Sequence, residues 1–500
     1  MILRKRSRIS FAVLCVALLG VLGRIFWITQ DRSTVVGSTE NRYSVTVAQV
    51  RGTIYDCNRE PLVNGEKEYR AAVSPDESLL SALRSSVSDD DFSALRERLS
   101  SGKPGTVRMS EPVAPLDGLK QFFVSRRYGE RLLAPHLLGY LDAGGENGIC
   151  GIEAAFNELL TGYSGKITAS FAIDAIGHDL KGIEPTVSDT TASAAGGVVL
   201  TLDKTIQQTV EDAAAGCLPL GAVVVLDPYS GAIKAMASFP TFQPDTVAVS
   251  IEADNGALVN RALALYDCGS VFKIVTAAAA LQSGIKQNTA FICNGGLNID
   301  GTSFHCHNRL GHSGLTMGEA FAQSCNLYFI QLASKIGAGK LYTSGNDFGF
   351  ARAITLAGTI KTPQPIFPSQ TELENSASAL ANMSFGQGYL MASPLHIAAM
   401  TATVVNDGVM PPIHLIDGTI NEKMAFFANS AGESYRLLQP ENAEIIRKMM
   451  SRVVEEGTGK RAKPTAETAA GKTGTAETGQ RSKNGDKDVI QSWFTGYYPA

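Results

Sequence analysis

The sequence has 500 residues, of which 44% are hydrophobic, enough for a large core spread over two to three domains. Its 44 lysines and arginines are offset by 48 aspartates and glutamates, giving a formal net charge of -4. No stripe of basic residues with interleaved aromatics is present, so the composition argues against a nucleic-acid-binding protein.

The N-terminus starts with the basic cluster RKRSR and continues, from Ile9 to Ile28, with an almost wholly apolar stretch. This stretch is long enough to cross a bilayer if Arg24 reaches the polar surface. A basic cluster before the span places the N-terminus in the cytoplasm. No clear small-x-small cleavage site follows, which favours an uncleaved anchor over a signal peptide. We therefore expect a cytoplasmic tail at residues 1–8, a single membrane helix at 9–29 and an extracytoplasmic remainder.

Residues 30–195 are rich in Ser, Asp, Glu and Gly and contain short strand-like stretches such as YSVTVAQV and KITASFAI. This composition indicates an extended, mixed α/β region. The Ser/Thr/Ala/Gly segment at 188–197 is typical of a linker. We therefore place the main domain boundary between residues 195 and 196.

Residues 196–500 begin with β-branched strands, GGVVLTLD and GAVVVLDPYSGAIKAMAS, the second pair joined at a DPYSG turn. Helical patterns follow at 270–283, 317–337, 393–406 and 440–456. GKTGTAET and VIQSWFTGYYP then return as strands. Strands, a helical block and strands again predict an α/β (α+β) fold in which a sheet is faced by helices, with an inserted all-α part.

The helix predicted from residue 270 places Ser270 and Lys273 on one face, since positions i and i+3 are neighbours. A serine hydroxyl needs a base within hydrogen-bond reach to act as a nucleophile. For Lys273 to be neutral near pH 7, its pKa must fall by roughly three units, and burial in the apolar run that follows acts in that direction. The same spacing recurs at Ser100 and Lys103, in a solvated Gly/Pro turn, and a serine at this position is more often a helix cap.

Two later motifs favour the nucleophile over the cap. FAQSCNLYF contains Ser324 and Asn326, a hydroxyl and an amide one residue apart. AAGKTGTAET carries an ammonium, two hydroxyls and a glycine on a predicted strand, at Lys472, Thr473, Gly474 and Thr475. Each motif is weak alone, but in this order across one domain they form a strong signal.

Ser-x-x-Lys, Ser-x-Asn and Lys-Thr-Gly together resemble the signature of penicillin-binding proteins and serine β-lactamases. The chain resembles a class B penicillin-binding protein of the elongation or sporulation type, a monofunctional peptidoglycan D,D-transpeptidase. The likeness extends to RGTIYDCNREPLV, LAPHLLGYL, GICGIEAAFNELLTG, SFGQGYLMASPLHIAAMTATVVNDG and EEGTGKRA. It implies an antiparallel sheet flanked by helices, an all-α subdomain and an N-terminal pedestal, assigned here to residues 30–195, with the transpeptidase domain at 196–500.

The resemblance also implies roles for these residues. Ser270 would attack the penultimate D-Ala of a stem peptide, and Lys273 would take its proton. Ser324 would pass a proton to the departing D-Ala and Asn326 would hold the substrate amide. The terminal carboxylate would bind to the Lys472 strand, and the backbone N–H groups of Ser270 and Thr475 would form the oxyanion hole. β-Lactams would acylate Ser270, and no cofactor is required for catalysis.

Eight cysteines in an exported chain raise the possibility of disulfides. Cys15 lies in the predicted span, and the other seven form an odd, unevenly spaced set. Three thiolates and an imidazole match a tetrahedral structural zinc site, made of Cys293, Cys306, His312 and Cys325. A Cys293–Cys306 disulfide and unligated thiols are the alternatives. Some relatives are similar in carrying zinc at this place.

Two features differ from the family pattern. Cys268 stands where a proline often precedes Gly-Ser, and the sequence closes at Ala500 where relatives continue with a strand and a helix. The latter leaves a non-catalytic scaffold or β-lactam sensor as an alternative, and the shared fold leaves a D,D-carboxypeptidase or β-lactamase. The expected partners are peptidoglycan stem peptides, β-lactams, the cell membrane and a polytopic membrane glycosyltransferase, with no nucleic acid.

Overall fold

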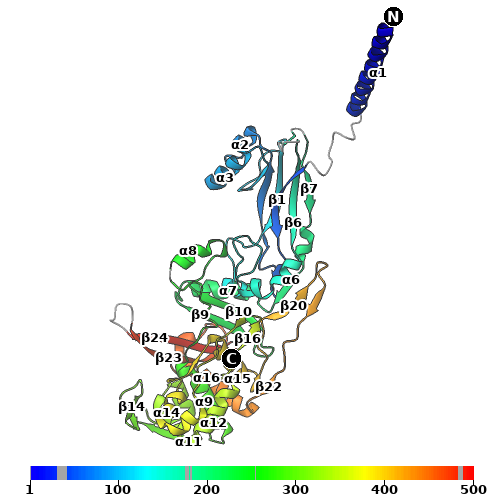
Figure 1. Ribbon diagram of the computed structural model, residues 1–500. Helices are drawn as coiled ribbons and strands as arrows, with labels where there is room; N and C mark the ends of the chain where they lie inside the picture. The colour runs from blue at the N-terminus through cyan, green and yellow to red at the C-terminus, as the bar shows by residue number, and fades with distance from the viewer. Residues whose placement is uncertain (1, 31–41, 175–178, 181–182, 254, 482–487) are drawn as a thin grey trace. The chain divides into compact units, whose positions relative to one another are not determined.

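The computed structural model describes residues 2–30, 42–174, 179–180, 183–253, 255–481 and 488–500 (Figure 1). Their contacts divide the chain into two compact units. The first comprises Met1–Arg51, Glu66–Arg127 and Ser164–Ser193, and the second comprises Gly52–Gly65, Tyr128–Tyr163 and Ala194–Ala500. The range 30–195, expected as one pedestal, therefore contributes segments to both units.

Helix α1 spans Ile2–Gln30. Its large apolar side chains between Phe11 and Trp27 are each more than half exposed. The side chains of the predicted cytoplasmic tail, residues 1–8, lie outside the described residues. Within the described part of the chain, no helix combines the length and the apolarity that a membrane crossing needs.

Beyond α1, the described residues of the first unit form two antiparallel three-stranded sheets and the helices α2 and α3. One sheet has the order β1-β6-β7, with β1 at Arg42–Val50, β6 at Gly165–Ala172 and β7 at Thr186–Asp189. The other has the order β4-β3-β5, with β3 at Glu66–Val73, β4 at Gly105–Met109 and β5 at Leu119–Arg126. Helices α2 (Glu77–Leu83) and α3 (Asp89–Ser100) bury leucines against the second sheet. The segment 188–197, expected as a linker, instead ends β7 and forms the 3-10 helix η3 (Thr191–Ala195).

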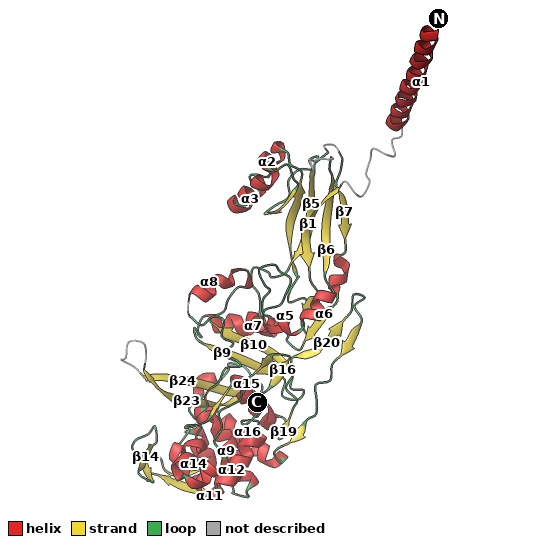
Figure 2. Cartoon of the chain, in the orientation of Figure 1, coloured by secondary structure: helices red, strands yellow, loops and turns green. Residues whose placement is uncertain are grey.

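The second unit mixes short strands and helices (Figure 2). Its N-terminal part contains β2 (Thr53–Tyr55), α4 (Pro135–Leu138), α5 (Gly151–Ala155), α6 (Asn157–Gly162), β8 (Gly197–Leu200) and α7 (Lys204–Ala215). Strands β9 (Gly221–Leu226) and β10 (Ile233–Phe239) form the predicted antiparallel hairpin. After it come η4 (Pro244–Thr246), α8 (Val247–Glu252) and β11 (Tyr266–Asp267).

The helical block starts with η5 (Gly269–Phe272) and α9 (Lys273–Gln282). Four short strands follow: β12 (Ala290–Cys293), β13 (Gly296–Ile299), β14 (Thr302–His305) and β15 (Ser313–Thr316). The remaining elements, up to and including the third predicted helix (393–406), are α10 (Met317–Ala322), α11 (Asn326–Ile336), α12 (Ala338–Asp347), β16 (Thr355–Ala357), β17 (Ile360–Lys361), α13 (Gln370–Asn375), α14 (Ala377–Ser384), β18 (Met391–Ala392) and α15 (Pro394–Val405). The helix expected at 317–337 is thus two helices, α10 and α11, separated by a turn.

The C-terminal part contains β19 (Val409–Met410), β20 (Ile416–Ile420), β21 (Phe426–Ala428), β22 (Tyr435–Arg436), α16 (Pro440–Glu455) and η6 (Lys460–Ala462). It ends in β23 (Ala470–Arg481) and β24 (Asp488–Tyr497), which pair antiparallel with Lys472 opposite Thr495. Both strands were predicted from their sequence pattern.

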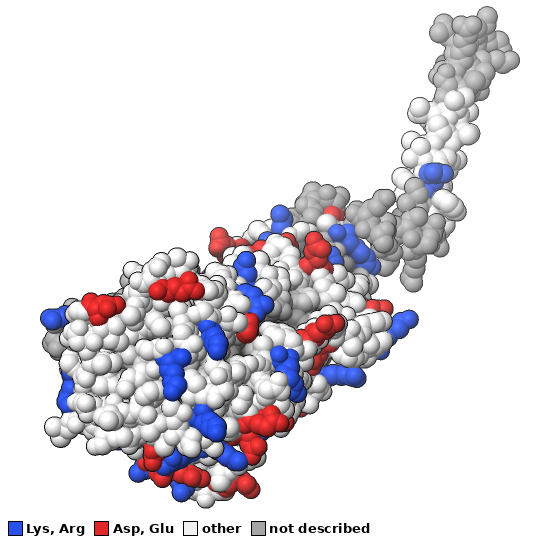
Figure 3. All heavy atoms as spheres, turned by 90° about the horizontal axis from the view of Figure 1, so that it is seen from below, with Lys and Arg blue, Asp and Glu red and all other residues white. Residues whose placement is uncertain are grey.

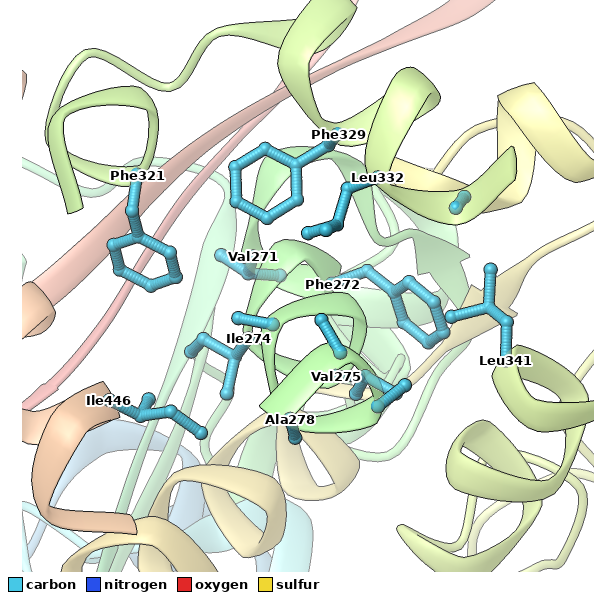
Figure 4. Close-up of a cluster of buried hydrophobic side chains, with 14 of the residues drawn as sticks. Val271, Phe272, Ile274, Val275, Ala278, Phe321, Phe329, Leu332, Leu341 and Ile446 are labelled. Carbon is cyan, nitrogen blue, oxygen red and sulfur yellow. The ribbon is translucent and has the colours of Figure 1, made fainter. Parts of the chain in front are cut away.

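Helix α9 lies in the centre of the largest core cluster, and every residue from Lys273 to Leu281 is buried. Figure 4 shows aromatic and aliphatic side chains around it, with Phe321 and Phe329 from the α10–α11 region and Ile446 from α16. The small side chains of the Ala277–Ala280 run let the neighbouring helices approach closely. Lys273 is therefore fully buried at the start of a helix that is packed on all sides by apolar side chains.

The distribution of charged residues on the surface agrees with the nearly balanced numbers of basic and acidic residues in the sequence. On the face in Figure 3, lysines and arginines alternate with acidic residues, and uncharged residues cover most of the surface. This face carries no continuous basic patch of the kind that binds nucleic acid.

Candidate active site

Ser270 lies in the tight turn of η5, directly before α9. The N-cap positions of η5 and α9 are Cys268 and Phe272, so Ser270 is not the cap of the helix. Gly269 has φ +56°, and a Cβ at this position would lie 2.9 Å from the carbonyl oxygen of Thr475. A glycine is therefore needed here for the serine turn to reach the strand β23.

Lys273 connects the serine turn to the α10–α11 turn. Its Nζ lies 2.9 Å from Oγ of Ser270 and 2.7 Å from Oδ1 of Asn326. The same nitrogen lies 2.7 Å from the carbonyl oxygen of Ser324 and 3.3 Å from its Oγ. Lys273 is fully buried, and burial lowers its pKa to about 7, although the thiols of Cys325 and Cys306 act in the opposite direction. A lysine with this pKa is partly neutral near pH 7 and can accept a proton.

Ser324 interrupts the predicted long helix, because it adopts a left-handed conformation with φ +52°. This conformation is costly for a residue with a Cβ, and such strain concentrates at functional sites. The turn brings Ser324 Oγ to the lysines and starts α11 at Asn326. The Nδ2 group of Asn326 donates to the carbonyl oxygen of His305 at 3.4 Å, which fixes the amide orientation.

Lys472 approaches Ser324 from β23. Its Nζ donates to Oγ of Ser324 at 3.0 Å and to the carbonyl oxygen of Thr473 at 2.7 Å. The residue is fully buried, and burial, followed by the charge of Lys273, lowers its pKa well below the ordinary value. Ser324 Oγ thus lies between two lysine amines, as a proton relay requires.

The strand β23 lies against the serine turn. A Cβ on Gly474 would lie 3.1 Å from Cγ1 of Val271, so a side chain here would push the strand away from η5. Thr475, the next residue, has its carbonyl beside Gly269. The sequence motif at 472–475 is therefore brought directly beside Ser270.

These elements enclose a cleft of about 850 Å³. Among the predicted residues, its walls include Ser270, Ser324, Asn326, Thr473, Gly474 and Thr475, while Lys273 and Lys472 contact Ser270 and Ser324 from the buried side. Further wall residues to which the sequence analysis assigned no role include Thr458, Asn382, Gln387, Arg309 and Glu477. Thr458 and Gln387 belong to EEGTG and SFGQG, stretches already noted for their family likeness.

Thr458 contacts the motif at 472–475 directly. Its Oγ1 lies 2.6 Å from Oγ1 of Thr473. A hydroxyl held in this way presents its free lone pair or proton in a defined direction. Thr458 is therefore a candidate for orienting Thr473 in the cleft.

The competing Ser100–Lys103 pair is not a site. Oγ of Ser100 donates to the carbonyl oxygen of Glu97 at 2.6 Å, within the last turn of α3. Lys103 is exposed. The three-residue spacing alone does not create a nucleophile and base.

The four predicted metal ligands come together behind Ser324. The candidate ligand atoms of Cys293, Cys306, His312 and Cys325 all lie within 4.8 Å of one another. Cys306 Sγ lies 3.5 Å from Nδ1 of His312 and 3.9 Å from Sγ of Cys325. With zinc–sulfur bonds of about 2.3 Å and zinc–nitrogen bonds of about 2.0 Å, a tetrahedral site separates its ligand atoms by roughly 3.5–3.8 Å.

Backbone hydrogen bonds hold together the segments that contain these ligands. The N–H of His312 donates to the carbonyl oxygen of Cys293 at 2.9 Å, and that of Cys306 donates to Gly295 at 3.1 Å. All four cysteines of the helical part of the chain, Cys268, Cys293, Cys306 and Cys325, are free thiols and buried. The donor set and spacing therefore fit zinc.

Comparison with known proteins yields matches across most of the chain. Residues 221–500 match the family model described as "Penicillin binding protein transpeptidase domain". Stage V sporulation protein D of Bacillus subtilis is 30% identical over 393 residues, which are 75% of this chain and 58% of the relative. The peptidoglycan D,D-transpeptidase PbpA of Mycolicibacterium smegmatis is 29% identical over 61% of this chain and 65% of its own length.

The fold has a matching solved structure. The D,D-transpeptidase domain of a peptidoglycan glycosyltransferase from Eggerthella lenta is 28% identical, with a TM-score of 0.62 and 89% of each chain covered. The chain therefore spans less than two thirds of the length of the curated relatives above, but most of this solved chain.

Proposed function

The chain belongs to the penicillin-binding protein transpeptidase family, and on this premise we propose that it is a peptidoglycan D,D-transpeptidase that cross-links stem peptides through an acyl-serine intermediate. The observation that carries the proposal is the Ser270–Lys273 pair, whose Oγ and Nζ lie 2.9 Å apart. Lys273 is fully buried and has a pKa lowered to about 7. The pair combines a nucleophile with a base that can be neutral at physiological pH.

In the acylation step, neutral Lys273 takes the hydroxyl proton of Ser270 as Oγ attacks the carbonyl carbon of the penultimate D-Ala. The backbone N–H groups of Ser270 and Thr475 are the proposed donors to the oxyanion, since the serine turn and β23 are in contact. Each such donor contributes about 3 kcal/mol of transition-state stabilisation. The peptide C–N bond then breaks and leaves an ester on Ser270.

The leaving D-Ala amine needs a proton. In this scheme Ser324 Oγ donates its proton to the leaving amine and is reprotonated by the Lys273 ammonium formed during the attack, since Oγ lies 3.3 Å from Nζ of Lys273 and 3.0 Å from Nζ of Lys472. A substrate carboxylate bound by the Lys472 strand would favour the charged form of that lysine. Asn326 would hold the substrate amide, and Thr473 and Thr475 would hold the carboxylate with their hydroxyls.

In the deacylation step, an amine from a neighbouring strand attacks the ester carbonyl, and neutral Lys273 takes a proton from this amine. The ester C–O bond breaks, an amide bond forms, and Lys273 passes the proton to the departing Ser270 Oγ. A β-lactam presents a carboxylate and a strained amide to the same groups, so it would acylate Ser270 and stop there. The side chains and backbone groups of the chain carry out every step, so the scheme needs no cofactor, in keeping with the family.

The zinc site is proposed as structural. Zn²⁺ would be held by Cys293, Cys306, His312 and Cys325, a set with no open position for a substrate. Cys325 lies between Ser324 and Asn326, so its ligation would tie the turn that carries both residues to the strands β12 to β15. The metal would stabilise this part of the fold and take no part in the chemistry.

The cellular setting is also proposed. We infer that α1 attaches the chain to the cell membrane, because its apolar side chains from Phe11 to Trp27 are exposed and a basic cluster precedes them. The transpeptidase domain, assigned to 196–500, would then be extracytoplasmic, with 30–195 as the pedestal. A polytopic glycosyltransferase that supplies the glycan strands is the proposed membrane partner, and co-purification from detergent-solubilised membranes tests it.

A transpeptidation assay tests the proposal. The full chain is given a D-Ala-D-Ala or thioester donor together with a D-amino acid acceptor, and the products are separated by chromatography. We expect the acceptor to appear in an amide product with wild-type protein and with Ser100→Ala, but not with Ser270→Ala. Hydrolysis without acceptor incorporation would indicate a carboxypeptidase, turnover of a chromogenic cephalosporin a β-lactamase, and no reaction at all a scaffold.

A further inference from the structure

Two charged residues line the cleft and take no part in the proposed chemistry: Arg309 and Glu477. Both are exposed. Within the described parts of the chain, neither side chain has a hydrogen-bond or ion-pair partner. The cleft thus offers one positive and one negative charge that are free to bind a ligand.

Glu477 lies on β23, two residues beyond Thr475. Along this strand Gly474 and Ala476 are buried, while Thr475 and Glu477 are exposed, as the alternation of a strand requires. Thr473, Thr475 and Glu477 therefore share the face that lines the cleft. At about 3.3 Å per residue, Glu477 lies about 7 Å further along the strand than Thr475.

Arg309 reaches the cleft from the other wall. It follows β14 in the loop between Cys306 and His312. The side chain of Asn308 fixes this loop, since its Nδ2 donates to the carbonyl oxygen of Gly311 at 2.7 Å and its Oδ1 accepts from the N–H of Leu310 at 3.1 Å. The position of Arg309 is therefore defined by a closed turn.

The direction of the donor peptide follows from the proposed function, on which this inference rests. Its terminal carboxylate binds near Thr473 and Thr475, and its scissile carbonyl lies at Ser270. The preceding part of the stem peptide continues along β23, away from Thr473 and toward Glu477. The side chain of the third stem-peptide residue, which precedes the penultimate D-Ala, then enters the part of the cleft that Arg309 and Glu477 line.

We propose that Arg309 and Glu477 form a subsite that selects a third stem-peptide residue whose side chain ends in both a carboxylate and an amine. Arg309 binds the carboxylate with its planar guanidinium, and Glu477 binds the ammonium. A lysine-type side chain satisfies Glu477 alone, and a neutral side chain satisfies neither charge. The preferred substrate class is therefore a stem peptide with a zwitterionic diamino acid, such as 2,6-diaminopimelate.

The test compares donors that differ only at this third residue. Four thioester donors carry 2,6-diaminopimelate, its side-chain carboxamide, lysine or norleucine, and kcat/KM is measured with the full chain. We expect the free diaminopimelate donor to react about tenfold faster than its carboxamide and faster still than the norleucine donor. Arg309→Gln should abolish the difference between the free acid and the carboxamide.

Matched variants separate selection from general damage. Glu477→Gln should abolish the advantage of lysine over norleucine, whereas Glu422→Gln and Lys423→Gln, exposed charges in the turn before β21, should leave all ratios unchanged. Acylation by a penicillin without a diamino side chain measures general damage, and it should be equal in the wild-type protein and in the two control variants, Glu422→Gln and Lys423→Gln. Wild-type rates that agree within twofold for all donors, or cleft variants that lower every rate equally, overturn the subsite. A wild-type chain that neither labels with penicillin nor uses any donor refutes the proposed function, and the subsite with it.

Discussion

The acylation rate of Ser270 is predicted to follow the protonation of Lys273. Burial lowers the pKa of this lysine from 10.5 to about 7. Only the neutral amine accepts the serine proton, so the rate should be half-maximal near pH 7, about a tenth of its maximum at pH 6 and about a hundredth at pH 5. An unperturbed lysine would instead give a rate that is still rising at pH 9.

Groups close to Lys273 also affect the pH dependence of the acylation rate, above all at alkaline pH. Lys472 lies close to Lys273 and has a lowered pKa, and its ammonium is the form that binds a carboxylate. A rise in pH that neutralises Lys472 therefore weakens carboxylate binding, and the profile should be bell-shaped. The thiols of Cys306 and Cys325 raise the pKa of Lys273, so its apparent value depends on their charge.

The assay is the second-order rate constant for labelling by a fluorescent penicillin, measured from pH 5 to 9 with the full chain in detergent. Lys273→Arg is the control, because a guanidinium does not lose its proton in this range. Its labelling should be slower by orders of magnitude and should not show a midpoint near pH 7. A wild-type profile that is flat from pH 5 to 8, or one with a midpoint near 10, would refute the assignment of Lys273 as the base.

Three further outcomes are expected. Thr458→Val removes the hydroxyl 2.6 Å from that of Thr473, so kcat/KM for peptide donors should fall about fivefold, the equivalent of about 1 kcal/mol, at an unchanged melting temperature. If the melting temperature falls in parallel, the role is structural. Gly269→Ala places a Cβ in a left-handed turn and 2.9 Å from the carbonyl oxygen of Thr475, so penicillin labelling should be lost and urea unfolding should show a loss of about 2 kcal/mol. Elemental analysis should find one zinc per chain in the wild-type protein and none in Cys325→Ser, with a lower melting temperature for the variant; a metal-free wild-type protein with a disulfide at Cys325 or elsewhere in the cluster would contradict the zinc site.

The sequence predicted the family and its transpeptidase fold correctly. Three short motifs made this possible, because they contain the reactive side chains and follow one another along the chain in the order that the family shares. It also predicted the strands β9, β10, β23 and β24 and the helices α9, α15 and α16 to within a few residues. Their hydrophobic residues recur with a clear helix or strand period, and turn-forming residues mark where they end. The roles assigned to the motif residues stay predictions until the variants are measured.

Other features depend on long-range packing that local patterns do not report. The break between α10 and α11 arises from one left-handed residue, Ser324, within an otherwise helical pattern. The segments 52–65 and 128–163 pack with the C-terminal unit although they are distant from it in sequence. Thr458 lies in the EEGTG stretch, which resembles the family, but that likeness alone assigned no role to its hydroxyl. The contact with Thr473 exists because the chain after α16 brings Thr458 beside β23.

The most direct test of the account is the site of covalent attachment of penicillin. The full chain is incubated with benzylpenicillin, digested, and analysed by tandem mass spectrometry. The account predicts one adduct, with the mass of the intact antibiotic, on Ser270, and none in Ser270→Ala. An adduct on another residue, or an unmodified wild-type chain, would contradict the assignment of Ser270 as the nucleophile.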